Sequence, residues 1–249
     1  MNAKFLEAAT EAAQAAGGFL RAHFGGVLNV DANEAHDIKL ELDRRTQHLI
    51  EGLLLGRFPD HCVLGEEGRA GDASAEYEWI VDPIDGTVNY FYGIPHFCVS
   101  IALRRAGDIL AGAIYDPMRD ELWAAETNGP ATLNGKEIRV SSRTVLSDAV
   151  VTVGFSKSAE SIANGLPVFE KLLREVKKCR MMGSAALDLA YVSCGRLDAY
   201  VESQISIWDI AAGKLIVERA GGSIRLSEHP TIPDKLSIVA SSGRIDLGI

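Results

Sequence analysis

The feature that most constrains this chain is a short apolar run that leads into two aspartates three residues apart, "WIVDPIDGT" at residues 79–87. The apolar residues 79–81 predict a buried strand that ends in Asp82 and Asp85. Carboxylates at the end of a buried strand repel each other and lose hydration, so they are costly unless a cation lies between them. The segment is therefore either a solvated turn or one wall of a cation site.

Two further segments repeat this pattern of an apolar strand followed by acid. Residues 62–68 include Glu66 and Glu67, and Asp209 follows an apolar stretch that begins at Ile205. Taken alone, each acidic segment has an ordinary explanation as a turn, a solvated loop or a helix N-cap. Taken together, they predict a site built from carboxylates without histidine or cysteine, which suits Mg²⁺ better than zinc.

Gly86 and Thr87 directly follow Asp85 and indicate what such a site is for. Glycine lets the backbone approach a ligand closely, and amide groups in a turn or at a helix start attract phosphate. The Thr87 hydroxyl can hold or polarise a water molecule. Metal-binding carboxylates beside a phosphate-sized set of amides predict metal-assisted hydrolysis of a phosphate ester.

Composition argues against several other classes of protein. A net charge of −9 disfavours a general nucleic-acid-binding protein, which needs a basic face. The 4 cysteines form no CxxC pair and lie in apolar stretches, so we expect buried free thiols in a reducing compartment. Early charged residues interrupt any signal-peptide core, and no apolar run reaches the ~20 residues of a membrane-spanning helix. We therefore expect a soluble cytoplasmic protein that binds neither nucleic acid nor membrane.

The periodicity of the chain predicts two halves, 1–145 and 146–249. In the first half, a helix (2–24), a half-buried strand (37–43) and a second helix (44–57) precede a series of strands separated by turn signals. These strands are expected at 62–68, 78–82, 97–105, 109–117 and 121–127. The second half alternates strands at 148–155, 179–182, 198–202, 223–226 and 235–241 with helices at 166–177, 184–192 and 209–220. We predict an α+β domain rich in antiparallel strands and then an α/β domain that completes the site, packed as one unit.

The motifs resemble those of the inositol monophosphatase family. The first signature of that family, D-P-[IVL]-D-G-T-x-N-[FY] after a strand, matches residues 82–90. The second, W-D-x-A-A-G with an apolar stretch and Gly-Gly behind it, matches residues 208–222, and an upstream G-E-E matches residues 65–67. Because their order and spacing hold across nearly the whole chain, the chain is identified as a member of this family.

The resemblance implies a fold, a cofactor and an activity. The fold is a layered αβαβα sandwich of the sugar-phosphatase type, usually found as a homodimer. The cofactor is Mg²⁺, two to three ions, and Li⁺ inhibits. The activity is hydrolysis of a small polyol or sugar phosphate by metal-activated water, with inositol 1-phosphate as the leading candidate.

The resemblance also assigns residues to roles. It makes the side chains of Glu66, Asp82, Asp85 and Asp209 and the carbonyl of Ile84 the metal ligands. Asp43 and Thr87 match the residues that orient and activate the attacking water. The residues that bind the substrate would be Ile84, Asp85, Gly86, Thr87, Gly183, Ser184, Ala185, Glu202 and Asp209. Among these, Gly183 to Ala185 would line the alcohol side, and Glu202 would bond a hydroxyl of the alcohol.

Departures from the family pattern leave the substrate open. Leu40 stands where the family often has threonine, which leaves open how residues 30–37 close and how a third metal is held. Gln204 and Ser206 differ from many inositol-type members, so the leaving-group pocket differs as well. Histidinol phosphate and fructose 1,6-bisphosphate therefore remain alternative substrates. A regulatory binding protein on the same fold is a further alternative, although no expected metal ligand is lost.

Overall fold

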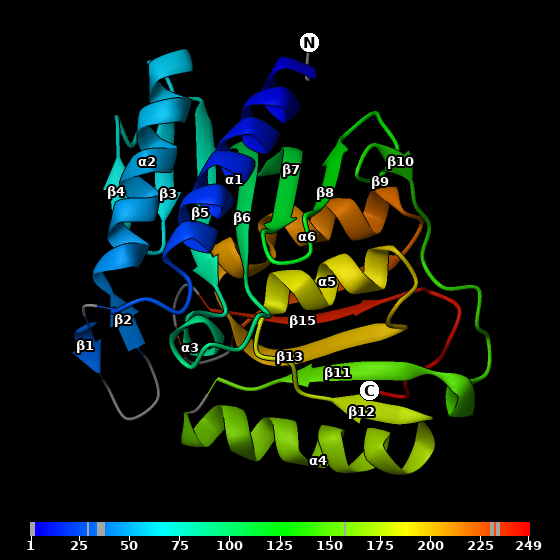
Figure 1. The fold of residues 1–249 in the computed structure, drawn as a ribbon. Coiled ribbons are helices and arrows are strands. Elements are labelled where there is room, and N and C mark those ends of the chain that lie inside the picture. The colour runs from blue at the N-terminus through cyan, green and yellow to red at the C-terminus, as the bar shows by residue number, and fades with distance from the viewer. Residues whose placement is uncertain (1–2, 29, 34–37, 157, 230–231, 233–234) are drawn as a thin grey trace.

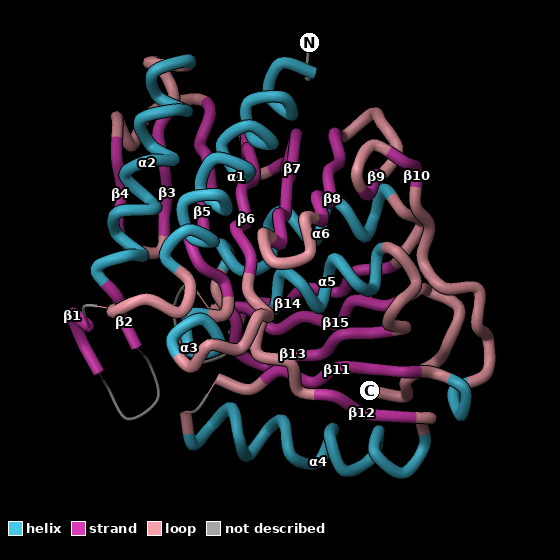
Figure 2. The backbone as a smooth tube through the Cα atoms, viewed as in Figure 1, coloured by secondary structure: helices cyan, strands magenta, loops and turns pink. Residues whose placement is uncertain are grey.

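Five layers of helices and sheets build the computed structural model, which describes residues 3–28, 30–33, 38–156, 158–229, 232 and 235–249. Helices α1 (Ala3–His23) and α2 (Glu41–Arg57) cover one face of a first sheet (Figure 1). Helices α5 (Ala185–Ser193) and α6 (Ile207–Arg219) lie between that sheet and a second one, whose outer face is covered by α4 (Ala159–Glu175) (Figure 2). This αβαβα order confirms the predicted fold class.

Within the described residues, the first sheet has eight strands in the order β10-β9-β8-β7-β6-β5-β3-β4. All neighbours are antiparallel except β3 and β5, which run parallel with Gly65 opposite Val81. Because the two parallel strands run to the same edge of the sheet, Glu66, which follows Gly65, and Asp82, which follows Val81, lie next to each other there. The strands are β3 (Cys62–Gly65), β4 (Gly68–Ala70), β5 (Tyr77–Asp85), β6 (Cys98–Arg105), β7 (Asp108–Asp116), β8 (Glu121–Glu126), β9 (Thr132–Leu133) and β10 (Lys136–Glu137).

The second sheet has five strands in the described part of the chain, in the order β12-β11-β13-β15-β14. The first three are parallel, as the predicted alternation of strands and helices requires, and the last two add an antiparallel hairpin. The strands are β11 (Val150–Gly154), β12 (Lys178–Arg180), β13 (Ala199–Ile205), β14 (Ser223–Glu228) and β15 (Leu236–Ser241). The smaller elements are the strand pair β1 (Val30–Asn33) and β2 (Ile38–Leu40), the helix α3 (Thr87–Phe91) and a 3₁₀ turn (Leu146–Asp148).

The core explains why the run before Asp82 is apolar without interruption. Trp79 and Val81 of β5 pack in the layer beneath α1 and α2, whereas Ile80 packs in the layer that contains α5 and α6. All three are at most 1% exposed. Since both faces of the strand are covered, the sequence has no polar face to present there.

The segment predicted as a strand over 37–43 is shorter than expected. Strand β2 ends at Leu40 and α2 begins at Glu41, which places Asp43 in the first turn of that helix. The Asp43 carboxylate accepts a hydrogen bond of 2.8 Å from the Leu40 amide, so an acid that we placed on a strand helps to begin a helix. Residues 34–37, including Asp37, lie outside the described part, and the prediction about how 30–37 closes remains a prediction.

Two further elements begin or end away from their predicted positions. Helix α4 begins at Ala159 instead of 166, because the Ser158 hydroxyl caps it by accepting from the Ser161 amide at 3.0 Å. Strand β5 continues past Asp82 to Asp85, with an irregular register between them against β6. Both aspartates therefore belong to the strand rather than to a turn after it.

The two sheets take their strands from opposite sides of the predicted boundary near residue 145, at 62–137 and 150–241. Even so, α5 and α6 from the second half pack against the first sheet. The division into domains 1–145 and 146–249 remains a prediction. All four cysteines are free thiols, as predicted, although Cys194 is only partly buried. None of the described helices is long and apolar enough to cross a membrane.

Candidate active site and metal centre

Three of the predicted metal ligands meet where strand β5 approaches the start of α6. Asp82 and Asp85 are buried at the end of β5, and Asp209 lies partly buried in the first turn of α6. One carboxylate oxygen from each lies within 4.8 Å of the other two. Helix α6 packs against β5 and β6, which brings residues more than a hundred positions apart into one cluster.

The electrostatics of this cluster fit a bound cation. Burial raises the pKa of Asp82 well above its usual range, and the carboxylates of Glu66, Asp85 and Asp209 raise it further. Burial, followed by the charge of Asp85, raises the pKa of Asp209 to about 7. Neighbouring carboxylates this close cannot all be charged cheaply unless a cation compensates them. The donor atoms are all oxygen, which is the set that hard divalent cations prefer.

Glu66 and Gly86 complete a small cavity around the cluster. The cavity has a volume of about 200 Å³, and it is lined by Glu66, Asp82, Ile84, Asp85, Gly86, Thr87, Val88, Gly183 and Asp209. Gly86 has a φ of 94°, and a Cβ there would lie 3.0 Å from the His96 carbonyl oxygen. A side chain at Gly86 would thus be strained by the backbone angle and crowded by the protein itself.

The two residues predicted to act on water lie beside each other, and Thr87 lines this cavity. The Thr87 hydroxyl oxygen is 2.8 Å from the Ile84 carbonyl oxygen and 3.4 Å from Asp43 Oδ1. Asp43 is 2% exposed, and the Leu40 amide holds its other oxygen. The structure therefore brings Asp43, Thr87 and Ile84 into one chain of polar contacts beside the carboxylate cluster.

Asp85 is held by the start of helix α5. The Ser184 hydroxyl and the Ala186 amide donate to Asp85 Oδ2, and the Ala185 amide donates to Oδ1 at 3.2 Å. Burial raises the pKa of Asp85, while these bonds oppose that rise by favouring the charged carboxylate. Ser184 and Ala185, predicted to line the alcohol side, therefore also orient a predicted metal ligand.

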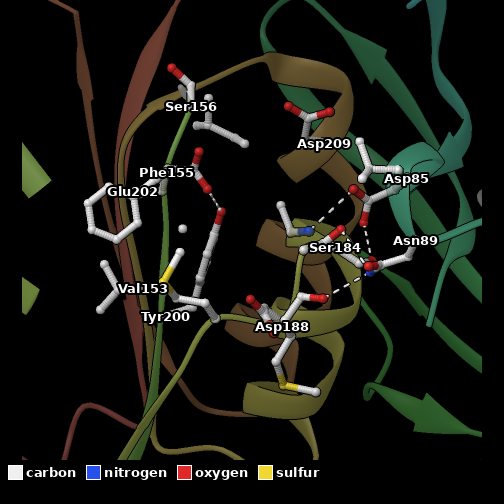
Figure 3. Close-up of a pocket in the computed structure, with 17 residues that line it drawn as sticks. Asp85, Asn89, Val153, Phe155, Ser156, Ser184, Asp188, Tyr200, Glu202 and Asp209 are labelled. Carbon is white, nitrogen blue, oxygen red and sulfur yellow. Dashed lines mark hydrogen bonds between the residues drawn. The ribbon is translucent and has the colours of Figure 1, made fainter. Parts of the chain in front are cut away.

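A larger cavity of about 580 Å³ opens beside the small one and shares Asp85, Val88, Gly183 and Asp209 with it (Figure 3). It is lined by the predicted residues Gly183, Ser184, Ala185 and Glu202. It is also lined by residues that sequence reasoning missed: Asn89, Val153, Gly154, Phe155, Ser156, Met181, Met182, Asp188, Tyr200 and Ile205. Two of these residues carried a sequence signal that could have revealed them: Asn89 is the fixed asparagine of the first signature, and Asp188 is an acid within an otherwise apolar helix.

The comparisons with known proteins agree with this geometry. The family model described as "Inositol monophosphatase family" matches residues 1–247. This chain belongs to the inositol monophosphatase family. Membership in the inositol monophosphatase family supports a phosphatase and, because the family is generally metal-dependent, agrees with the acidic cluster.

Individual relatives within the inositol monophosphatase family carry different names. The "Inositol-1-monophosphatase" of Mesorhizobium japonicum is 41% identical over 223 residues, which cover 88% of this chain and 84% of that protein. The "Nus factor SuhB" of Xylella fastidiosa is 40% identical over 231 residues, 90% of this chain and 84% of that protein. The crystal structure of the extragenic suppressor protein suhB from Bartonella henselae has a TM-score of 0.90 at 35% identity, covering 97% of this chain and 95% of that one.

Proposed function

We propose that this chain is a Mg²⁺-dependent phosphomonoesterase that acts on the monophosphate of a small polyhydroxy alcohol, with inositol 1-phosphate as the first candidate. The observation that carries the proposal is the cluster of Asp82, Asp85 and Asp209, whose small cavity shares part of its lining with a larger one. A phosphate group fits the first cavity while its alcohol occupies the second.

The acidic residues would hold the metal ions. Asp82, Asp85 and Asp209 would bind them, with Glu66 and the Ile84 carbonyl as further ligands from the walls of the same cavity. When bound, such ions would polarise the phosphate and lower the pKa of a water molecule, so that the water loses a proton more easily and becomes a better nucleophile. The hydrogen bonds from Ser184, Ala185 and Ala186 orient Asp85 for that purpose and favour its charged form.

Asp43 and Thr87 would position the attacking water. The Thr87 hydroxyl can donate to the Ile84 carbonyl at 2.8 Å, which leaves its lone pairs to accept a hydrogen bond from the water. Asp43 Oδ1 lies 3.4 Å from the same hydroxyl and can accept the proton that the water loses. Both side chains are fixed by backbone groups, so the water would be held in one direction.

The charge of the larger cavity favours a monophosphate over a bisphosphate. Its described lining includes four carboxyl groups, Asp85, Asp188, Glu202 and Asp209, and no lysine, arginine or histidine. Carboxyl groups form hydrogen bonds with the hydroxyl groups of an alcohol, whereas a lining without a cationic side chain offers no counter-charge to a second phosphate. Fructose 1,6-bisphosphate is therefore the weaker alternative, whereas histidinol phosphate, which carries an ammonium group, is the stronger one.

The proposal extends to the cellular location, the oligomeric state and the inhibition of the enzyme. We expect a cytoplasmic homodimer that Li⁺ inhibits and that binds no nucleic acid. The four free thiols support a reducing compartment. The regulatory alternative has one specific support, since a relative is named a Nus factor. The retained acidic cluster favours the enzyme.

A substrate panel tests the proposal. Phosphate release is measured with Mg²⁺ from inositol 1-phosphate, histidinol phosphate and fructose 1,6-bisphosphate, with and without Li⁺ and with a chelator in place of Mg²⁺. We expect the highest kcat/KM on inositol 1-phosphate, inhibition by Li⁺ and no release with chelator. If no ester releases phosphate, the enzyme proposal is wrong and the regulatory alternative gains.

A further inference from the structure

The Glu202 carboxylate is held in one direction by two residues of the second sheet. The hydroxyl of Tyr200, two positions earlier on β13, donates to Glu202 Oε2 at 2.6 Å (Figure 3). Gly154 of the neighbouring strand β11 is paired with Glu202 in the sheet register. A Cβ on Gly154 would lie 1.8 Å from Glu202 Oε2 and 3.2 Å from the Tyr200 hydroxyl. The position opposite the carboxylate must therefore have no side chain.

The burial of the pair makes this arrangement rigid. Tyr200 is 0% exposed and Glu202 is 8% exposed, on the wall of the larger cavity. Burial raises the pKa of Tyr200 well above its usual value, so its hydroxyl keeps the proton that it donates. Burial also raises the pKa of Glu202, to about 8, and the bond from Tyr200 acts against that rise by favouring the carboxylate. Oε2 is thus satisfied inside the protein.

We propose that Tyr200 is a positioning residue that, in the space left by Gly154, aims the Glu202 carboxylate so that Oε1 accepts a hydrogen bond from one hydroxyl of the alcohol. The inference rests on the proposed function, because it concerns the alcohol half of the same site. In this arrangement Tyr200 never contacts the phosphate or the cluster of Asp82, Asp85 and Asp209. Its effect is confined to substrates that offer a hydroxyl to Glu202.

The role makes a selective prediction. Tyr200→Phe removes only the hydroxyl, so the carboxylate can turn and loses the donor that favours its charge. We expect kcat/KM to fall about tenfold on the polyhydroxy monophosphate that the wild type hydrolyses fastest, mainly through KM. On 4-nitrophenyl phosphate, which has no such hydroxyl, kcat/KM should stay within about twofold, because the metal and water groups are untouched.

A double-mutant cycle separates positioning from a general structural role. If Tyr200 acts through Glu202, the double variant Tyr200→Phe/Glu202→Ala should have the same kcat/KM on the polyhydroxy substrate as Glu202→Ala alone. Gly154→Ala should reproduce the selective loss, because its Cβ displaces the carboxylate. Gly18→Ala is the matched control, since a Cβ there meets no atom within 4 Å, and it should leave both activities unchanged.

The outcomes distinguish the inference from the function on which it rests. Equal losses on both esters in Tyr200→Phe, or additive losses in the double variant, would overturn the positioning role while the phosphatase stands. The midpoint of thermal unfolding reports independently whether each variant is folded. If the wild type releases phosphate from neither ester, the proposed function is overturned and the positioning role with it.

Discussion

Single side chains in this site serve both the fold and the chemistry. Asp209 lies in the carboxylate cluster, and its Oδ2 also accepts a hydrogen bond of 3.0 Å from the Ser206 amide at the start of α6. Asp43 does the same for α2, since it accepts from the Leu40 amide and lies beside Thr87. The acids of the motifs could be predicted from sequence. Their capping bonds could not, because the predicted boundaries of these helices were two to three residues late.

Asp188 is a buried carboxyl whose titration should be visible in stability. It is 2% exposed, its Oδ1 has no hydrogen bond among the described residues, and burial raises its pKa well above the usual value. The nearby Thr152 hydroxyl favours the charged form without completing a bond of normal geometry. Because the folded pKa lies above the unfolded value of 3.8, this group destabilises the fold increasingly as pH rises above about 4.

Replacing Asp188 by asparagine should remove that pH dependence. Without metal, we expect the free energy of unfolding of Asp188→Asn to rise relative to that of the wild type as pH rises. The gain should be about 1.4 kcal/mol for each pH unit between the unfolded and the folded pKa of Asp188. Urea unfolding at pH 4, 6 and 8 with chelator measures the difference. A difference that does not change with pH, or that falls as pH rises, would show that Asp188 ionises as easily in the folded protein as in the unfolded chain.

At the scale of elements, two glycines allow helix α6 to pack closely against strand β7 and helix α5. A Cβ on Gly112 of β7 would lie 3.0 Å from the Cα of Ala212 in α6, and a Cβ on Gly213 of α6 would lie 2.5 Å from the side chain of Leu189 in α5. These close approaches let α6 lie against the first sheet and α5 together. They also fix where α6 holds Asp209 relative to Asp82.

Gly112→Ala should therefore weaken the fold and the metal site together. We expect unfolding to become easier by about 1–3 kcal/mol, because the methyl group pushes against the backbone of α6. The affinity for Mg²⁺ should fall as well, since Asp209 moves with that helix. Gly18→Ala in α1, whose Cβ would meet nothing within 4 Å, is the control and should be neutral or slightly stabilising. Denaturation and Mg²⁺ titrations that leave Gly112→Ala unchanged would contradict this account of α6.

Helix α4 shows why some boundaries could not be predicted from the sequence. Asn164 and Gly165 are typical of turns, and the helix was expected to begin directly after them, at residue 166. In the structure they lie inside α4, and a Cβ on Gly165 would come within 2.4 Å of the Phe155 ring. Gly165 therefore permits a close packing contact rather than a turn. Only the tertiary structure contains that information.

At the scale of the whole molecule, the site lies where two sheets and the α5–α6 layer meet. The motifs made the carboxylates predictable, because each follows an apolar strand or opens a helix. The alcohol side was less predictable, because Tyr200, Gly154 and Asp188 acquire their roles only when β11, β13 and α5 come together. Tyr200 and Gly154 belong to no chemical motif in the sequence, and Asp188 stands out only as an acid within an apolar helix.

The concentration of acid at this junction predicts that metal stabilises the whole fold. A ligand that binds only the folded state adds about 2.7 kcal/mol at a hundred times its Kd. We expect Mg²⁺ to raise the midpoint of thermal unfolding of the wild type and a chelator to lower it. The rise should be much smaller in Asp82→Asn, which removes one of the clustered carboxylates. An equal rise in both proteins would mean that the ions bind elsewhere.

The most direct test of the central claim is phosphate release from inositol 1-phosphate across a range of Mg²⁺ concentrations. It is measured for the wild type, Asp82→Asn and Asp209→Asn, with folding verified for each. We expect saturable dependence on Mg²⁺ in the wild type, no release with chelator, and a loss in both variants greater than the 10- to 100-fold that is typical of outer-sphere changes. Release by the wild type that persists without metal, or near-full activity in either variant, would contradict the assignment of Asp82, Asp85 and Asp209 as the metal centre.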